Sequence, residues 1–195
     1  MATWKSRGLR GSLFEDLINR TNDVYRERGT ALVQKIPTPI TPMEFDSESR
    51  HITLAYFDQK STVDYIGIAQ GIALCFDCKE CAADTFALQN IHEHQYNFMK
   101  EFERQGGVAF LLIYYSHREK IYFMRCDEIV KFYDRGADET REDNRKSFRF
   151  DELDERFLYD MPSEPFVNYL EFVNDYLDYR EENGIEQEHF AKNNA

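Results

Sequence analysis

The chain has 195 residues and a net charge of −12. Its hydrophobic residues (42%) and aromatic residues (15%) suffice for one domain with a buried core, so a wholly disordered chain is excluded. The acidic balance argues against general affinity for nucleic acids, although basic residues near the N-terminus leave room for a local basic face. No apolar run approaches the roughly 20 residues of a membrane span, and the first residues lack the apolar stretch of a secretion signal. We therefore expect a soluble, cytoplasmic protein without a membrane partner.

The spacing of apolar residues predicts alternating helices and strands. Helices are expected at 12–28, 88–104, 127–134 and 165–180, where apolar residues recur on one helix face. Strands are expected at 31–36, 52–57, 62–65, 72–79, 108–115 and 120–125. The segment 108–115 is the most apolar and should lie at the centre of a sheet.

This order of elements predicts an α/β fold with a mixed central sheet flanked by helices. We expect a single domain over residues 1–195. A flexible basic N-terminus at 1–10 and a polar tail at 182–195 would lie outside its core.

Three cysteines form a C-x2-C-x2-C run at Cys75, Cys78 and Cys81, a pattern that could indicate a metal or iron–sulfur site. On a strand, however, Cys75 and Cys78 point to opposite faces, so three thiolates would not converge on one ion. We interpret these residues and Cys126 as semi-buried thiols in a reducing compartment.

Asp77 and Lys79 stand two residues apart near the end of the predicted strand 72–79, so their side chains leave the same face. A turn near Gly67 and Gly71 would pair this strand with the segment around Asp64 and make Asp64 and Asp77 neighbours. Two adjacent carboxylates favour a hard divalent cation such as Mg²⁺. The pattern is typical of nucleases in which a metal binds the scissile phosphate and a lysine aligns or deprotonates the attacking water.

The same pattern is also compatible with a surface ion pair at a strand edge, and a second Asp-x-Lys occurs at Asp58 and Lys60. Glu15 could supply a third carboxylate, or it could complete a helix capping box with Ser12.

Other polar residues have two interpretations as well. Thr62 shares a strand face with Asp64, or it is a β-branched filler of the strand. Gln95 lies on the apolar stripe of its helix, where it could contact a bound water or be a semi-buried polar residue. His92 and His94 are two apart on that helix and should point apart, which disfavours joint metal binding.

Several segments together resemble the RecU-type Holliday junction resolvases, a bacterial branch of the PD-(D/E)xK nuclease superfamily. They follow the order of the family and span about residues 10–155. The segments are RG at 10–11, FED at 14–16, INRTN at 18–22, KIPTPI at 35–40, AYF at 55–57, KSTVDYIG at 60–67, FDCKE at 76–80, LQNIHEHQ at 88–95 and KSFRFDEL at 146–153.

The resemblance implies a restriction-endonuclease-like fold, a homodimer, and paired cleavage of four-way DNA junctions in recombination and repair. It implies Mg²⁺ as the cofactor, with Mn²⁺ as a substitute, and recombination proteins as further partners. By motif, the catalytic residues are Asp64, Asp77, Lys79, Thr62, Glu15 and Gln95; the metal ligands are Asp64, Asp77, Thr62 and the Cys78 carbonyl; and the DNA contacts are Lys35, Arg50 and Arg10.

Some features depart from the family. Position 77 usually holds Glu, and the segment 41–51, which resembles the stalk of the family, is short. This segment is also more acidic than usual, with Glu44, Asp46 and Glu48 against Arg50. Two alternatives therefore stay open: a PD-(D/E)xK nuclease for other branched or duplex DNA, and a non-catalytic DNA-binding or recombinase-modulating factor.

Overall fold

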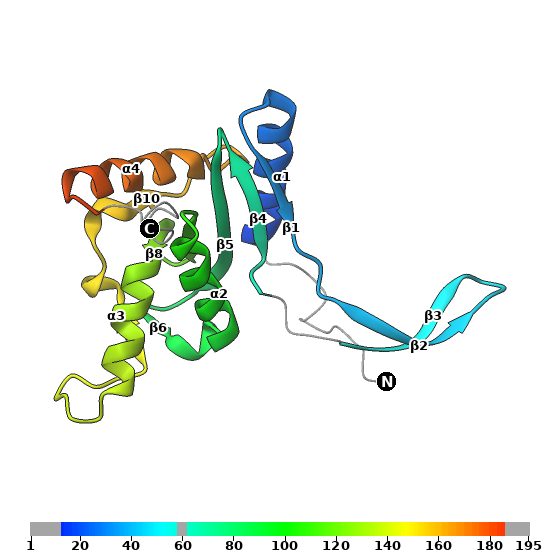
Figure 1. Cartoon of the computed structure of the whole chain (residues 1–195). Coiled ribbons are helices and arrows are strands. Elements are labelled where there is room, and N and C mark those ends of the chain that lie inside the picture. Colours follow the sequence, from blue (N-terminus) through cyan, green and yellow to red (C-terminus); the bar gives the residue numbers. More distant parts are fainter. Residues whose placement is uncertain (1–12, 58–61, 186–195) are drawn as a thin grey trace, which may run out of the picture.

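The computed structural model describes residues 13–57 and 62–185 of the chain. Figure 1 shows an α/β body from which one hairpin projects. The body is built on a six-stranded sheet in the order β1-β4-β5-β7-β8-β10. Its strands are β1 (Leu32–Lys35), β4 (Tyr65–Ala69), β5 (Ile72–Cys81), β7 (Val108–Tyr115), β8 (Lys120–Arg125) and β10 (Leu158–Asp160). Since β5 and β7 are parallel and the other neighbours antiparallel, the predicted mixed sheet is confirmed.

Helices cover both faces of this sheet. They are α1 (Leu13–Arg28), α2 (Glu93–Arg104), α3 (Cys126–Ala137) and α4 (Tyr169–Glu182). Tyr169 of α4 packs against Phe76 of β5 and against Tyr25 of α1, so α1 and α4 share one face. The helix α2 connects the parallel strands β5 and β7 and contacts both. None of the described helices is long and apolar enough to cross a bilayer.

An aromatic ladder crosses the middle of the sheet. The ring of Phe76 stacks on Tyr65 and on Phe110, at 4.8 Å between centroids in both cases, and Phe110 stacks on Phe123 at 4.5 Å. Tyr65, Phe76 and Phe110 are directly opposite one another in the strand register. Such cross-strand aromatic pairs specify register, because a slip by one residue would move every ring to the other face.

The helix predicted at 88–104 begins later than expected. Residues Leu88–Asn90 form a short 3-10 helix (η1), and the backbone of Ile91 and His92 is extended before α2 begins at Glu93. The last helix likewise begins at Tyr169, after Pro162 and Pro165, rather than at 165. A proline restricts the residue before it to extended conformations, which disfavours a helix across Met161 and Glu164.

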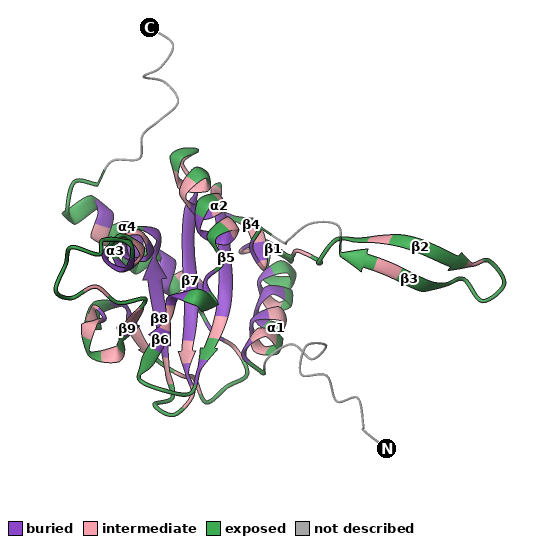
Figure 2. Cartoon of the chain, turned by 90° about the horizontal axis from the view of Figure 1, so that it is seen from below, coloured by how far each residue is buried: buried purple, intermediate pink, exposed green. Residues whose placement is uncertain are grey.

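The projecting hairpin is formed by β2 (Ile40–Asp46) and β3 (His51–Phe57), which pair only with each other. It therefore extends beyond the segment 41–51 that resembles a stalk. Figure 2 shows that β2 and β3 are mostly exposed, in contrast to the buried strands β5 and β7. Among the exposed hairpin residues are Met43, Phe45, Leu54 and Phe57. Among the described residues, the hairpin thus has little of the packing that a two-stranded ribbon needs for stability.

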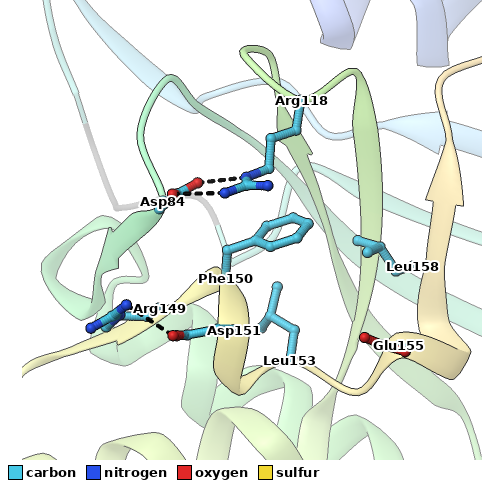
Figure 3. A pocket seen from close by; sticks show the side chains of 8 residues that line it. All are labelled: Asp84, Arg118, Arg149, Phe150, Asp151, Leu153, Glu155 and Leu158. Carbon is cyan, nitrogen blue, oxygen red and sulfur yellow. Dashed lines mark hydrogen bonds and ion pairs between the residues drawn. The ribbon is translucent and has the colours of Figure 1, made fainter.

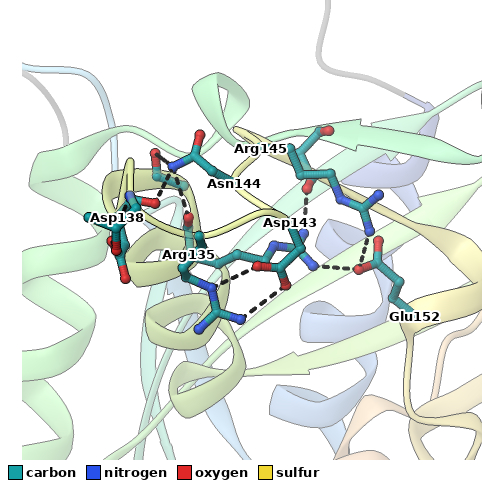
Figure 4. Close-up of polar contacts among 10 residues, drawn as sticks. Arg135, Asp138, Asp143, Asn144, Arg145 and Glu152 are labelled. Carbon is teal, nitrogen blue, oxygen red and sulfur yellow. Dashed lines mark hydrogen bonds and ion pairs between the residues drawn. The ribbon is translucent and has the colours of Figure 1, made fainter.

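Salt bridges stabilise the segment between α3 and β10. This stretch contains β9 (Ser147–Arg149), which pairs with β6 (Thr85–Ala87), and the short 3-10 helices η2 (Phe150–Glu152) and η3 (Glu155–Phe157). Glu152 forms ion pairs with Arg135 of α3 and with Arg145 (Figure 4). The side-chain amide of Asn144 donates hydrogen bonds to the backbone carbonyls of Arg135 and Asp138. These bonds cap the C-terminal end of α3.

Candidate active site

The second half of β5 is open along one side. The strand β4 pairs with β5 only from Ile72 to Phe76, whereas β7 accompanies β5 as far as Cys81. Within the described ranges, no strand therefore lies beside residues 77–81 on the β4 side. Unpaired backbone groups of a strand edge are free to bind other groups.

Asp77 and Lys79 lie on this open half and share a face, as predicted. Lys79 Nζ lies 2.7 Å from Asp77 Oδ2, and the Asp77 side chain is fully buried while that of Lys79 is 19% exposed. Apart from this ion pair, neither carboxylate oxygen of Asp77 has a hydrogen-bond partner among the described residues. Burial raises the pKa of Asp77, and Lys79 only partly opposes this effect.

Asp64 lies immediately before β4, next to this pair. The register of the β4–β5 hairpin ends with Tyr65 opposite Phe76, so one further step places Asp64 opposite Asp77. The half-buried carboxylate of Asp64 accepts a hydrogen bond from the Cys78 backbone N–H at 3.4 Å. The side chain of Asp64 therefore occupies the place where a longer β4 would have continued.

The Cys78 carbonyl is directed to the same place. In a strand, the N–H and C=O groups of one residue point to the same side. Because the Cys78 N–H faces Asp64, its carbonyl oxygen also faces the open edge. The thiol itself is buried and its pKa is raised by burial, so the backbone is the part of Cys78 that is available to the site.

Glu15 approaches this group from α1. Its carboxylate forms an ion pair with Lys35 Nζ of β1 at 2.5 Å. Glu15 is near enough to Asp77 for its negative charge to raise the pKa of that carboxyl. The interpretation of Glu15 as a third carboxylate of the site stays a prediction, while Ser12, the expected partner in a capping box, lies outside the described residues.

Gln95 is buried at the beginning of α2, where its side-chain oxygen accepts a hydrogen bond from the His92 backbone N–H at 3.2 Å. This contact caps the helix and gives Gln95 a structural function. The expectation that His92 and His94 point apart is wrong. Their rings stack with centroids 5.4 Å apart, because His92 precedes the helix in an extended conformation instead of lying on it.

The remaining predicted residues are less closely tied to the carboxylates. Thr62 is exposed at the start of the second described range. Arg50 lies in the turn at the tip of the β2–β3 hairpin, where it is exposed and has a positive φ of 58°. Arg10 falls outside the described residues.

The residues at the open edge fit a hard divalent cation. The described part of the chain contains no preformed cluster of three or more His, Cys, Asp or Glu side chains. Mg²⁺, however, is commonly held by one or two carboxylates and completes its shell with water and substrate oxygens. The buried carboxylate of Asp77, together with the Asp64 carboxylate and the Cys78 carbonyl, supplies such a donor set.

A separate cleft of about 300 Å³ lies beyond the end of β5 (Figure 3). Both oxygens of Asp84 pair with Arg118, at 2.6 and 2.8 Å, and Arg149 pairs with Asp151 at 2.8 Å. Hydrogen bonds from Arg118 and His117 lower the pKa of Asp84. Asp84, Arg118, Arg149 and Asp151 of this cleft are therefore paired with one another, and none of the carboxylate-site residues lines it.

Two residues next to the site were not predicted from the sequence. The buried Tyr65 hydroxyl donates to Asn19 Oδ1 at 2.9 Å and lies 3.4 Å from the Glu15 carbonyl. These contacts join α1 to β4 close to the carboxylates. The spacing of Glu15 and Asn19, four residues apart on α1, was the available signal, since such residues share one helix face.

Comparison with known proteins gives a consistent result. The sequence model of the family described as Recombination protein U matches residues 9–175. The Holliday junction resolvase RecU of Bacillus licheniformis is 35% identical over 169 residues, which cover 84% of this chain and 82% of that protein. The RecU protein of Bacillus subtilis is also 35% identical, over 84% of this chain and 79% of its own length.

A solved structure of the Holliday junction resolvase Hjc from Archaeoglobus fulgidus is similar at a TM-score of 0.35 and 12% identity, covering 56% of this chain and 77% of its own. The family match and the curated relatives extend over most of the sequence. The chain belongs to the Recombination protein U (RecU) family.

Proposed function

We propose that this protein is a metal-dependent endonuclease that resolves four-way DNA junctions by cutting a pair of strands. The observation that carries this proposal is the open half of β5, where Asp64, Asp77, Lys79 and the Cys78 backbone lie together. Relatives that are 35% identical over most of the chain are named Holliday junction resolvases, which supports the choice of substrate.

Asp64, Asp77 and the Cys78 carbonyl would hold the metal, and Glu15 would add a carboxylate to its outer shell. A bound Mg²⁺ or Mn²⁺ would supply a Lewis acid that polarises the scissile phosphate and lowers the pKa of a water ligand. Lys79, whose ammonium lies 2.7 Å from Asp77 Oδ2 and whose side chain is 19% exposed, would orient the attacking water and offset charge on the phosphate. In-line attack would leave a 5′-phosphate and a 3′-hydroxyl.

A homodimer would place two such sites on a substrate that has two strands to cut. The β2–β3 hairpin supports this assembly, because its exposed side chains include Met43 (64%), Phe45 (60%) and Phe57 (75%). An isolated hairpin with so much apolar surface is typical of an interaction surface. The cytoplasm and the recombination machinery are the proposed setting of the enzyme.

The acidic residues of the hairpin favour a second candidate, a nuclease of the same chemistry that prefers other DNA structures. Glu44 and Glu48 are exposed near Arg50 and would repel the closely spaced phosphates at a junction centre. By motif, Arg50 and Arg10 remain proposed contacts to the DNA backbone, and Thr62 and Gln95 remain proposed accessory residues of the site.

The test is cleavage of a synthetic four-way junction, a flap and a linear duplex by the same preparation, with Mg²⁺, with Mn²⁺ and with EDTA. We expect metal-dependent cutting of the junction and its loss in Asp77→Ala. Asp160→Ala is the matched control, because Asp160 also pairs with a lysine (Lys120, 2.6 Å) but is 84% exposed. Full activity of Asp77→Ala would refute the assigned site, and preferred cutting of the flap or duplex would support the second candidate.

A further inference from the structure

One ion pair links α1 to the edge of the sheet beside the carboxylates. Lys35 is the last residue of β1, and its Nζ lies 2.5 Å from Glu15 Oε2. The side chains of Lys35 and Glu15 are 41% and 23% exposed, respectively. The pair is therefore partly shielded from water, and it joins two elements that are distant in sequence.

The position of Lys35 is determined by the sheet. Lys35 stands directly opposite Tyr65 in the β1–β4 register, so the two side chains lie on the same face. The Lys35 ammonium lies 5.8 Å from the centroid of the Tyr65 ring, within the range of a cation–π contact. Because Tyr65 is fully buried and stacked on Phe76, it provides a rigid support for the lysine.

Tyr65 also contacts α1, the helix that carries Glu15, the second residue of the ion pair. The Tyr65 hydroxyl donates to Asn19, one turn after Glu15 on α1, and lies 3.4 Å from the Glu15 carbonyl. Both the backbone and the carboxylate of Glu15 are thus held by the β1–β4 strand pair. Little freedom remains for the Glu15 side chain relative to Asp64, which immediately precedes Tyr65.

The β1 end of this pair lies beside the carboxylate site. Ile36, the residue after Lys35, donates its backbone N–H to the carbonyl of Asp64 at 2.8 Å, so the chain that carries Lys35 is joined to the residue that carries the Asp64 carboxylate. Glu15 brings further negative charge to a site that already holds Asp64 and Asp77. A cation beside Glu15 reduces the repulsion among these acids before a metal binds.

We propose that Lys35 is a positioning residue that holds the Glu15 carboxylate at the metal site, and that it is not the direct DNA phosphate contact its motif suggests. This inference rests on the proposed metal-dependent nuclease. It makes Lys35 a supporting neighbour of a metal-site carboxylate, a kind of contact whose removal commonly lowers metal affinity.

The experiment compares wild type, Lys35→Ala, Glu15→Gln and the double variant, with Lys120→Ala as the matched control for loss of a surface lysine in an ion pair of similar length. Junction affinity is measured in EDTA at several salt concentrations. Metal affinity is measured as the Mg²⁺ midpoint of the rise in Tm and, independently, as the Mg²⁺ midpoint of cleavage.

In Lys35→Ala, we expect both Mg²⁺ midpoints to rise by about tenfold, with junction affinity and its salt slope unchanged. Glu15→Gln should show a similar rise, and the double variant should add little to either single change. Lys120→Ala should behave as wild type.

A loss of junction affinity in Lys35→Ala together with a salt slope reduced by about 0.9 would overturn the inference, because that is the signature of a lost phosphate contact. An unchanged Mg²⁺ midpoint would overturn it as well. If wild type cuts no DNA with any metal, the proposed function fails, and the Tm measurement still decides the function of Lys35 in metal binding.

Discussion

Ionised Asp77 should destabilise the metal-free protein. Its carboxylate is fully buried, and the ion pair with Lys79 is the main compensation that the described residues offer for the loss of water. The replacement Asp77→Asn keeps the size of the side chain and removes the charge. We expect the free energy of unfolding to increase at neutral pH in EDTA, while cleavage of the junction is lost.

The magnitude follows from two opposing contributions. Removing the charge from a fully buried carboxylate relieves the cost of its desolvation, which is about 1–3 kcal/mol. Loss of the attraction to Lys79 costs about 0.2–1 kcal/mol, because the lysine is partly exposed and its flexible side chain can extend to water. The net stabilisation is therefore about 1–2 kcal/mol, which corresponds to a rise in Tm of about 2–8 °C for a chain of this size.

The assay is urea unfolding in EDTA between pH 4 and pH 8. Because burial raises the pKa of folded Asp77 above its ordinary value of 3.8, the wild-type protein should lose stability as the pH increases from about 4 through the folded pKa, and Asp77→Asn should lack this pH-dependent loss of stability. Mg²⁺ should stabilise wild type and have little effect on the variant. Destabilisation of Asp77→Asn in EDTA, with Asp160→Asn neutral as the control, would refute the reasoning.

Other predictions concern separate parts of the molecule. Lys79→Ala should reduce the rate of junction cleavage by about 10²–10⁴-fold while junction affinity in EDTA is retained, because Lys79 acts on the water and not on binding. Burial raises the pKa of Glu103 to about 7, so Glu103→Gln should increase the free energy of unfolding at pH 8 by up to about 3 kcal/mol and leave it unchanged near pH 4; equal effects at both pH values in urea titrations would contradict this. The double replacement Phe45→Glu and Ile52→Glu should shift the protein from dimer to monomer in light scattering without lowering Tm, whereas Thr53→Glu should leave the dimer intact; a dimer that survives the double change would exclude the hairpin as its interface.

Local patterns were sufficient for the centre of the fold and for the main pair of the site. The strands 108–115 and 120–125 have the predicted limits, because they are apolar and bounded by polar turns. The shared face of Asp77 and Lys79 follows from the period of a strand alone. The proximity of Asp64 could also be predicted, since a two-residue turn at Gln70 and Gly71 leaves one register for the β4–β5 hairpin.

Contacts between distant segments could not be predicted in this way. The pairing of Lys35 with Glu15 depends on how α1 crosses the end of β1, which no local spacing encodes. The sequence predicts a shorter protrusion than the hairpin of residues 40–57, because Pro42 and the polar residues near the tip are typical of a loop. The two segments nevertheless pair along their length. The sequence does not predict the stacking of His92 on His94, because this contact depends on the helix beginning at Glu93. Apolar spacing does not determine the first residue of a helix that exactly.

The shortness of β4 explains why the site lies where it does. A strand edge with free N–H and C=O groups is normally a liability, because another chain can pair with it. Here Asp64, the residue just before β4, covers the Cys78 N–H with its side chain, so the edge is closed to a further strand but the neighbouring carbonyl still faces outward. If β4 continued in register past Asp64, its backbone would take up the Cys78 groups, and Asp77 would be buried without access to a cation. The end of one strand therefore creates both the carboxylate pair and the open strand edge beside it.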